Sequence, residues 1–194
     1  MSKKAVKLDS KQRCTWCLSD PIYVKYHDQE WGVPVHDDSI LFEFLILEGA
    51  QAGLSWLTIL KRREGYKKAF CNFNPKKVAQ LQEADFRRLV LDERIIRHEG
   101  KIRSTIGNAQ AFLKVQKEFG SFAQYAWSFV GHKPIITRRK ANERLPATTA
   151  ESDAFSKDLK KRGFKFVGST IIYAYMQAVG MVNDHSELCY RAKK

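Results

Sequence analysis

The chain has 194 residues, of which 44% are hydrophobic and 12% aromatic; this suffices for one domain with a sizeable core and excludes a disordered protein. A formal net charge of +13 makes a polyanion such as nucleic acid the first partner to consider. No apolar run approaches the roughly 20 residues that span a bilayer, and no secretory signal is apparent, so we expect a cytoplasmic protein with no membrane partner.

Helix signals dominate from residue 37 onward. Asn74 followed by Pro75 is typical of a helix start, Ser152 is a second candidate N-cap, and Gly49, Gly120 and Gly163 are natural stops. The predicted helices cover residues 37–49, 54–70, 74–82, 81–91, 99–120, 122–130, 152–163 and 167–180.

Strand signals are weak. The runs IIT (135–137) and FKFV (164–167) are too short to build a sheet, and residues 131–152 form the best loop candidate. We therefore predict an all-α bundle whose two chain ends meet. Its boundaries are expected to be a basic flexible extension at residues 1–12, a single α-helical domain at 13–190 and a basic tail at 191–194.

Cysteine and histidine residues gather near both ends of the chain. His185 and Cys189 lie four apart in NDHSELC, so one helical turn would place them on one face as two corners of a zinc tetrahedron. Cys14 could supply the remaining corners together with Cys17, as in a Cys-x-x-Cys knuckle, or together with His27. Spacing alone favours Cys17, because that knuckle is the commoner device.

Alternatives to a metal site remain at this point. The thiols could simply be buried, or CTWC (14–17) could be a redox pair, although such pairs usually follow a strand. A zinc ion held by four protein ligands would be structural, because it keeps no open position for a substrate.

An acidic residue and several aromatics form a second cluster with chemical potential. Glu48 ends the apolar run LFEFLILEG between Gly49 and Gly53, and Trp56 follows. Further aromatics, Trp16, Tyr23, Tyr26 and Trp31, lie upstream. Aromatic faces stack on a nucleobase and favour a cationic one, while a carboxylate accepts hydrogen bonds from an exocyclic amine. Core packing is the alternative for each ring taken singly.

Long stretches of the chain resemble a known family. The segments are WCLSDPIYVKYHDQEWGVP, FEFLILEGAQAGLSWLTILKRRE, IIRHEGKI, GNAQAF, WSFV, KKRGFKFVGSTI and MQAVGMVNDH. Together they resemble the bacterial 3-methyladenine DNA glycosylase I family from Arg13 to about Cys189. The resemblance implies an all-α helix-hairpin-helix glycosylase fold, with the hairpin around IIRHEGK and a structural Zn²⁺ joining the chain ends.

The same resemblance implies residue roles. The zinc ligands fall on Cys14, His27, His185 and Cys189, which leaves Cys17 outside the site. The base pocket falls on Tyr26, Trp56, Trp16 and Tyr23, with Glu48 as the catalytic residue. The implied reaction is flipping and hydrolytic removal of 3-methyladenine from double-stranded alkylated DNA, without lyase activity and without an organic cofactor. We expect a monomer.

Contacts to the DNA backbone and stack are predicted separately. Leu54 is the candidate wedge, and Gly53 would let the backbone approach closely. The candidate phosphate contacts are Arg97, His98, Lys101 and Lys165. Two rival functions are a zinc-stabilised DNA-binding module without catalysis, which would leave Glu48 idle, and a thiol redox protein.

Overall fold

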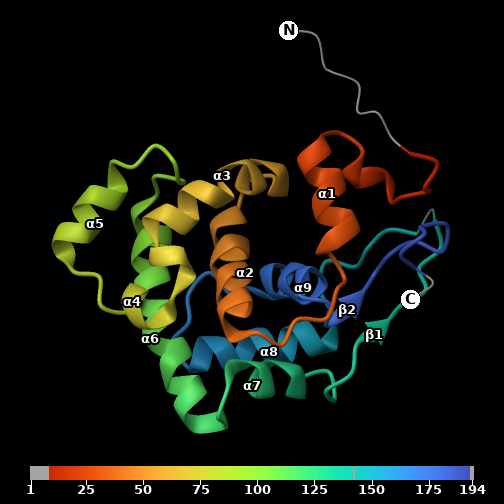
Figure 1. The fold of residues 1–194 in the computed structure, drawn as a ribbon. Coiled ribbons are helices and arrows are strands. Elements are labelled where there is room, and N and C mark those ends of the chain that lie inside the picture. The colour runs from red at the N-terminus through yellow and green to blue at the C-terminus, as the bar shows by residue number, and fades with distance from the viewer. Residues whose placement is uncertain (1–8, 142, 193–194) are drawn as a thin grey trace, which may run out of the picture.

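The structure, a computed structural model, describes residues 9–141 and 143–192 and is almost entirely helical (Figure 1). Most of the predicted basic extension and the last two residues of the predicted tail lie outside this part of the chain. The helices are α1 Pro21–Gln29, α2 Asp38–Gln51, α3 Trp56–Ala69, α4 Pro75–Val78, α5 Glu83–Val90, α6 Glu99–Phe119, α7 Phe122–Ser128, α8 Ala150–Lys161 and α9 Ser169–Ala178, with 3₁₀ turns η1 Thr15–Cys17 and η2 Cys71–Phe73. The all-α prediction is confirmed.

Helix α2 is the centre of the core. Every residue from Leu41 to Ala50 is buried, so this helix has no polar face, and it packs against α3, α6, α7 and α9. Figure 1 shows α2 in the middle of the molecule, with α4, α5 and α6 on one side of it and α9 on the other. Any charged residue on α2 must therefore find a partner or lose its charge.

Local signals explain where several helices begin. Asp20 accepts a hydrogen bond from Ile22 N and precedes Pro21 at the first position of α1, a helix absent from our predictions although this signature was available. The predicted cap of α8 was wrong by three residues. Thr149 is the N-cap, and its hydroxyl accepts a hydrogen bond from Ser152 N. The Ser152 hydroxyl in turn accepts from Thr149 N at 2.8 Å, which completes a capping box.

A small parallel sheet corrects the expectation that IIT would form no strand. β1 (Ile135–Ile136) pairs with β2 (Val182–Asn183), Ile135 opposite Val182. Two residues per strand leave no readable alternation in the sequence, so this pairing depends on tertiary contacts. It attaches the predicted loop 131–152 to the C-terminal segment.

The two ends of the chain meet, as expected. Tyr190 N donates to Gln12 O at 2.9 Å, and Figure 1 shows the C-terminal segment beside the segment that leads into α1. Among the residues described, no helix has both the length and the apolar character needed to cross a membrane.

Residues 91–98 join α5 to α6, and they include most of the segment to which the resemblance assigned a hairpin. This turn packs closely on α3, because a Cβ at Gly65 would overlap the backbone of Arg94. Gly65 therefore lets the turn approach the helix.

We expect Gly65→Ala to lower the free energy of unfolding by about 1–3 kcal/mol, since the added methyl group overpacks the contact with Arg94. Gly107→Ala is the matched control: Gly107 is also helical and has no atom within 4 Å of its would-be Cβ, so the change should stabilise by up to about 1 kcal/mol. Urea denaturation of both variants measures the difference, and equal stabilities would contradict the close packing.

Candidate functional site

A cavity of about 240 Å³ opens beside α2 and is walled mainly by aromatic rings. Its volume lies below the roughly 300–1,000 Å³ of sites for drug-sized ligands, which suits a small planar molecule. It brings together the catalytic and base-binding residues predicted from sequence. The lining residues are Trp16, Tyr23, Tyr26, Trp31, Glu48, Gln51, Trp56, Leu145, Ala174 and Gln177.

Helix starts place the aromatic walls. The cap at Asp20 sets the phase of α1, so Tyr23 and Tyr26, three residues apart, share one face. Ser55 caps α3 by accepting from Thr58 N, which makes Trp56 the first helical residue. The ring centroids of Tyr26 and Trp56 are 5.5 Å apart, and the ring planes are inclined by 55°. The two rings therefore do not stack face to face on each other.

Glu48 lies in the last turn of α2, which extends two residues beyond the predicted stop at Gly49. It is only 3% exposed, and its Oε2 has no hydrogen-bond partner among the described residues. Burial raises the pKa of this carboxyl well above its ordinary value, because desolvation disfavours the charged form. The buried Nε1 of Trp56, in the same cavity, also lacks a partner there. Such groups are rare in folded proteins and are expected where a ligand binds.

The other buried glutamate of α2 has a different environment. Glu43 Oε1 accepts from Arg63 Nε at 2.6 Å, and Arg63 also contacts Glu30 Oε2 at 2.6 Å. Within the described part of the chain, the fold therefore provides a cation for Glu43 and none for Glu48, although only five positions separate them on one helix.

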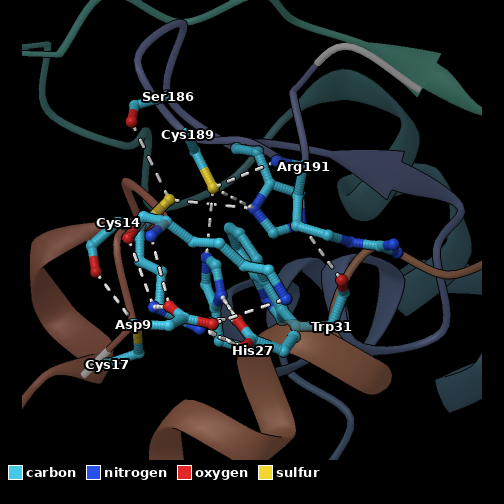
Figure 2. A network of polar contacts seen from close by, with 12 residues as sticks. Asp9, Cys14, Cys17, His27, Trp31, Ser186, Cys189 and Arg191 are labelled. Atoms are coloured by element: carbon cyan, nitrogen blue, oxygen red, sulfur yellow. Dashed lines mark hydrogen bonds and ion pairs between the residues drawn. The ribbon is translucent and has the colours of Figure 1, made fainter. Parts of the chain in front are cut away.

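Four buried side chains from the chain ends form a compact cluster (Figure 2). The ligand atoms of Cys14, His27, His185 and Cys189 all lie within 4.8 Å of one another. Cys189 Sγ is 3.4 Å from both His27 Nε2 and His185 Nδ1, and Cys14 Sγ is 3.8 Å from His185 Nδ1. Two sulfurs and two nitrogens arranged this way can hold a metal ion in four-coordinate geometry.

Contacts outside the cluster orient both imidazoles for metal binding. His27 Nδ1 lies 2.9 Å from Asp28 Oδ1, and Arg13 in turn donates to the Asp28 carboxylate. His185 Nε2 lies 3.1 Å from Trp31 O. These acceptors favour a proton on the outer nitrogen of each ring and leave the inner lone pair facing the cluster.

Cys17 is buried but points elsewhere. Its Sγ donates to Cys14 O at 3.1 Å, and it is not part of the four-residue group (Figure 2). The spacing rule that favoured a Cys-x-x-Cys pair is therefore not supported. The rings of Trp16 and Trp31 pack against His27 and His185, at centroid distances of 5.4 and 4.5 Å, so the cluster also supports the cavity wall.

Comparisons with known proteins agree with this geometry. Residues 16–192 match the family model of methyladenine glycosylase. The chain is 54% identical over 178 residues to DNA-3-methyladenine glycosylase 1 of Escherichia coli strain K12, which covers 92% of this chain and 95% of that relative. The chain belongs to the methyladenine glycosylase family. It is accordingly a glycosylase, an enzyme that cleaves an N-glycosidic bond.

Solved structures of the family have the same fold. A crystal structure of 3-methyladenine DNA glycosylase I has a TM-score of 0.90 and 52% identity, covering 92% of this chain and 98% of that one. A Tyr-to-Phe variant of such an enzyme, in complex with 3-methyladenine, has a TM-score of 0.91 and 37% identity, covering 94% and 98%.

The predicted DNA contacts of this methyladenine glycosylase lie outside the cavity. Gly53 has a φ of +79°, and Leu54 beside it is 39% exposed in the turn after α2. His98 is exposed and caps α6, because its Nδ1 accepts from Lys101 N at 3.2 Å. Arg97 and Lys165 are exposed, with Arg97 Nη1 3.6 Å from Glu93 Oε1.

Lys101 does not fit its predicted role as a phosphate contact. Its side chain is buried, and Nζ donates to Ala50 O at 2.8 Å and to Ala52 O at 2.6 Å. The ammonium group satisfies carbonyls at the C-terminus of α2, where a cation is favourable.

Trp31 belonged to the predicted aromatic cluster without an assigned role, and four further cavity residues were missing from the prediction: Gln51, Leu145, Ala174 and Gln177. Leu145 comes from the predicted loop, and the sequence of a loop does not predict which way its side chains point. Ala174 and Gln177 lie three apart on α9, and a glutamine within an otherwise apolar buried helix was a signal that could have been used.

The unpartnered burial of Glu48 generates a prediction about stability and pH. The folded protein binds the Glu48 proton more tightly than the unfolded chain, because burial raises the folded-state pKa. The loss of folding stability caused by Glu48 is therefore absent below the pKa of glutamate in the unfolded chain, about 4.3. It grows as the pH rises from there towards the pKa of Glu48 in the folded protein. At pH 7 we expect Glu48→Gln to raise the free energy of unfolding by about 1–3 kcal/mol, a gain that disappears near pH 4.

Glu43→Gln is the control, since it removes one of the two acidic partners of Arg63 and should destabilise at pH 7. Chemical denaturation at several pH values measures both variants. A Glu48→Gln difference that is the same at pH 4 and pH 7 would contradict the raised pKa.

Proposed function

We propose that the protein removes 3-methyladenine from alkylated double-stranded DNA by hydrolysing the bond between base and sugar, as a monomeric base-excision repair enzyme without lyase activity. The observation that carries the proposal is Glu48, a buried carboxyl with an unpartnered oxygen in an aromatic cavity. The names of the relatives, and the solved relative in complex with 3-methyladenine, support this choice of substrate.

Charge would distinguish the damaged base from normal adenine. Methylation at N3 leaves the base cationic, and aromatic faces attract a cation more strongly than a neutral ring. The cation would also be the counter-ion that Glu48 lacks. Its arrival would favour the ionised carboxylate, whose attraction to the base offsets the desolvation that raises the pKa in the free protein. A neutral base gains neither contribution.

The same charge makes the chemistry easier. The bond to the sugar is already weakened, and the departing base becomes neutral, so a strong general acid is less needed. Glu48 would recognise the base and stabilise positive charge in the transition state. Among the described lining residues Glu48 is the only acidic one, so no second carboxylate in this cavity is available to activate water.

The damaged nucleotide would have to leave the duplex to reach the cavity, at a cost of a few kcal/mol that is lower for a damaged base. Leu54, exposed in the turn directly after α2, is suited to fill the gap. Arg97, His98 and Lys165 would contact phosphates. His98 packs on Phe166, at a centroid distance of 6.1 Å, and Phe166 lies against Gly49, so this group of residues lies near the turn that bears Leu54.

The four-residue cluster would hold a structural Zn²⁺. Its donor set of two thiols and two imidazoles, with inner lone pairs free, suits zinc, and four protein ligands leave no position for substrate. The ion would join Cys14, before α1, and His27, on α1, to the segment after β2. It would thereby hold Trp16 and Trp31 at the cavity wall.

Excision tests the proposal directly. Incubating the protein with methylated DNA should release 3-methyladenine, and Glu48→Gln should lower the single-turnover rate about 10²-fold or more, since one preorganised charge is lost from the transition state. Glu43→Gln, assayed where it remains folded, should keep a much larger share of the rate. Binding without release would favour a DNA-binding module, and a full rate with full selectivity in Glu48→Gln would remove that residue from the mechanism.

Metal content tests the zinc site. His27→Ala should purify without zinc and unfold at a lower temperature, because it removes one of the four ligands. Cys17→Ala should keep one zinc ion per chain, since its thiol bonds only to Cys14 O. Elemental analysis measures both, and the reverse pattern would restore the Cys-x-x-Cys site.

A further inference from the structure

Gln177 on α9 contributes a polar group to the cavity that the proposed mechanism does not use. The side chain is buried and lines the cavity. Its Nε2 donates to Asp184 Oδ2 at 2.5 Å. Asp184 is 1% exposed and also accepts from Tyr173 Oη at 2.6 Å and from Thr137 Oγ1 at 2.7 Å.

This arrangement fixes which way the amide of Gln177 faces. The carboxyl oxygens of Asp184 accept from three surrounding donors, Gln177 Nε2, Tyr173 Oη and Thr137 Oγ1, so the amide nitrogen is the atom of Gln177 that meets Asp184. The carbonyl Oε1 is then directed away from Asp184. Among the described residues no protein donor contacts this oxygen, although Gln177 lines the cavity.

We propose that Gln177 is a specificity-determining residue: its Oε1 accepts a hydrogen bond from the exocyclic amino group at C6 of the base and disfavours bases with an oxygen there. The inference rests on the proposed function and extends it to the choice between methylated purines. An adenine-type base has two N–H donors at C6, whereas a guanine-type base has a carbonyl acceptor. Opposite that carbonyl, Oε1 would meet a second acceptor instead of a donor. Both oxygens would then be removed from water without a hydrogen bond between them, which costs free energy.

Glu48 cannot make this distinction by charge alone, because methylation at N3 makes adenine and guanine derivatives cationic alike. A neutral acceptor in a fixed orientation discriminates by hydrogen-bond pattern instead. Asp184 is the positioning residue, since it prevents the amide from rotating to present its N–H groups. Its neighbour His185 belongs to the four-residue cluster, so the same segment carries both functions.

The test is a competition on one substrate, DNA alkylated so that it contains both 3-methyladenine and 3-methylguanine, with the released bases separated by chromatography. Gln177→Met keeps length and volume but removes the amide oxygen. We expect the ratio of 3-methyladenine to 3-methylguanine release to fall about 10- to 100-fold, with zinc content unchanged. Asp184→Asn should shift the ratio in the same direction, because an asparagine can accept either orientation of the amide.

Each result is decisive. An unchanged ratio in Gln177→Met, or equal losses for both bases, overturns the inference. Should Gln177→Met fail to fold, Gln177→Asn, which withdraws the oxygen by one methylene, is measured by the same ratio. A wild-type protein that releases no 3-methyladenine would refute the proposed function itself, which keeps that failure separate from failure of the role of Gln177.

Discussion

The meeting of Cys14 and His27 with His185 and Cys189 is the contact on which the cavity depends. Trp16 lies between the first two in sequence and packs on the His27 ring, while Trp31 packs on His185. The two tryptophans, which form part of the cavity wall, are thus held by two histidines that are far apart in the chain. Because the ligand atoms approach within 4.8 Å, a shift at either end would move these rings as well. The cluster is therefore part of the architecture of the site.

The buried helix α2 imposes a second constraint, on charge and not on position. Its two glutamates are buried in different environments: Glu43 faces Arg63, whereas Glu48 lines the aromatic cavity and has no cation beside it among the described residues. An unpaired buried carboxyl destabilises the free protein. A cationic ligand reverses that penalty, so the energy withheld from stability becomes available for selecting a charged base.

Several of these features could be read from the sequence, and the exceptions have physical reasons. Capping residues and apolar spacing located most helices, but α1 was overlooked despite Asp20 and Pro21. Spacing alone favoured Cys17 over His27, but the choice depends on where each side chain points after η1 and α1 pack. The resemblance selected His27, in agreement with the geometry. The pairing of β1 with β2 and the entry of Leu145 into the cavity arise from tertiary contacts that no local pattern encodes.

Gln177 illustrates the same limit at the level of a single hydrogen bond. Its position on α9 predicts burial, but the direction of its amide follows only from Asp184, seven residues later and beyond the end of the helix. Two different acceptors then face one cavity. A carboxylate would respond to the charge of the base, and an oriented carbonyl would respond to the pattern of donors at its edge. Because these two properties vary independently among methylated purines, an acceptor with a fixed orientation would add a selection by donor pattern to the selection by charge that Glu48 would provide.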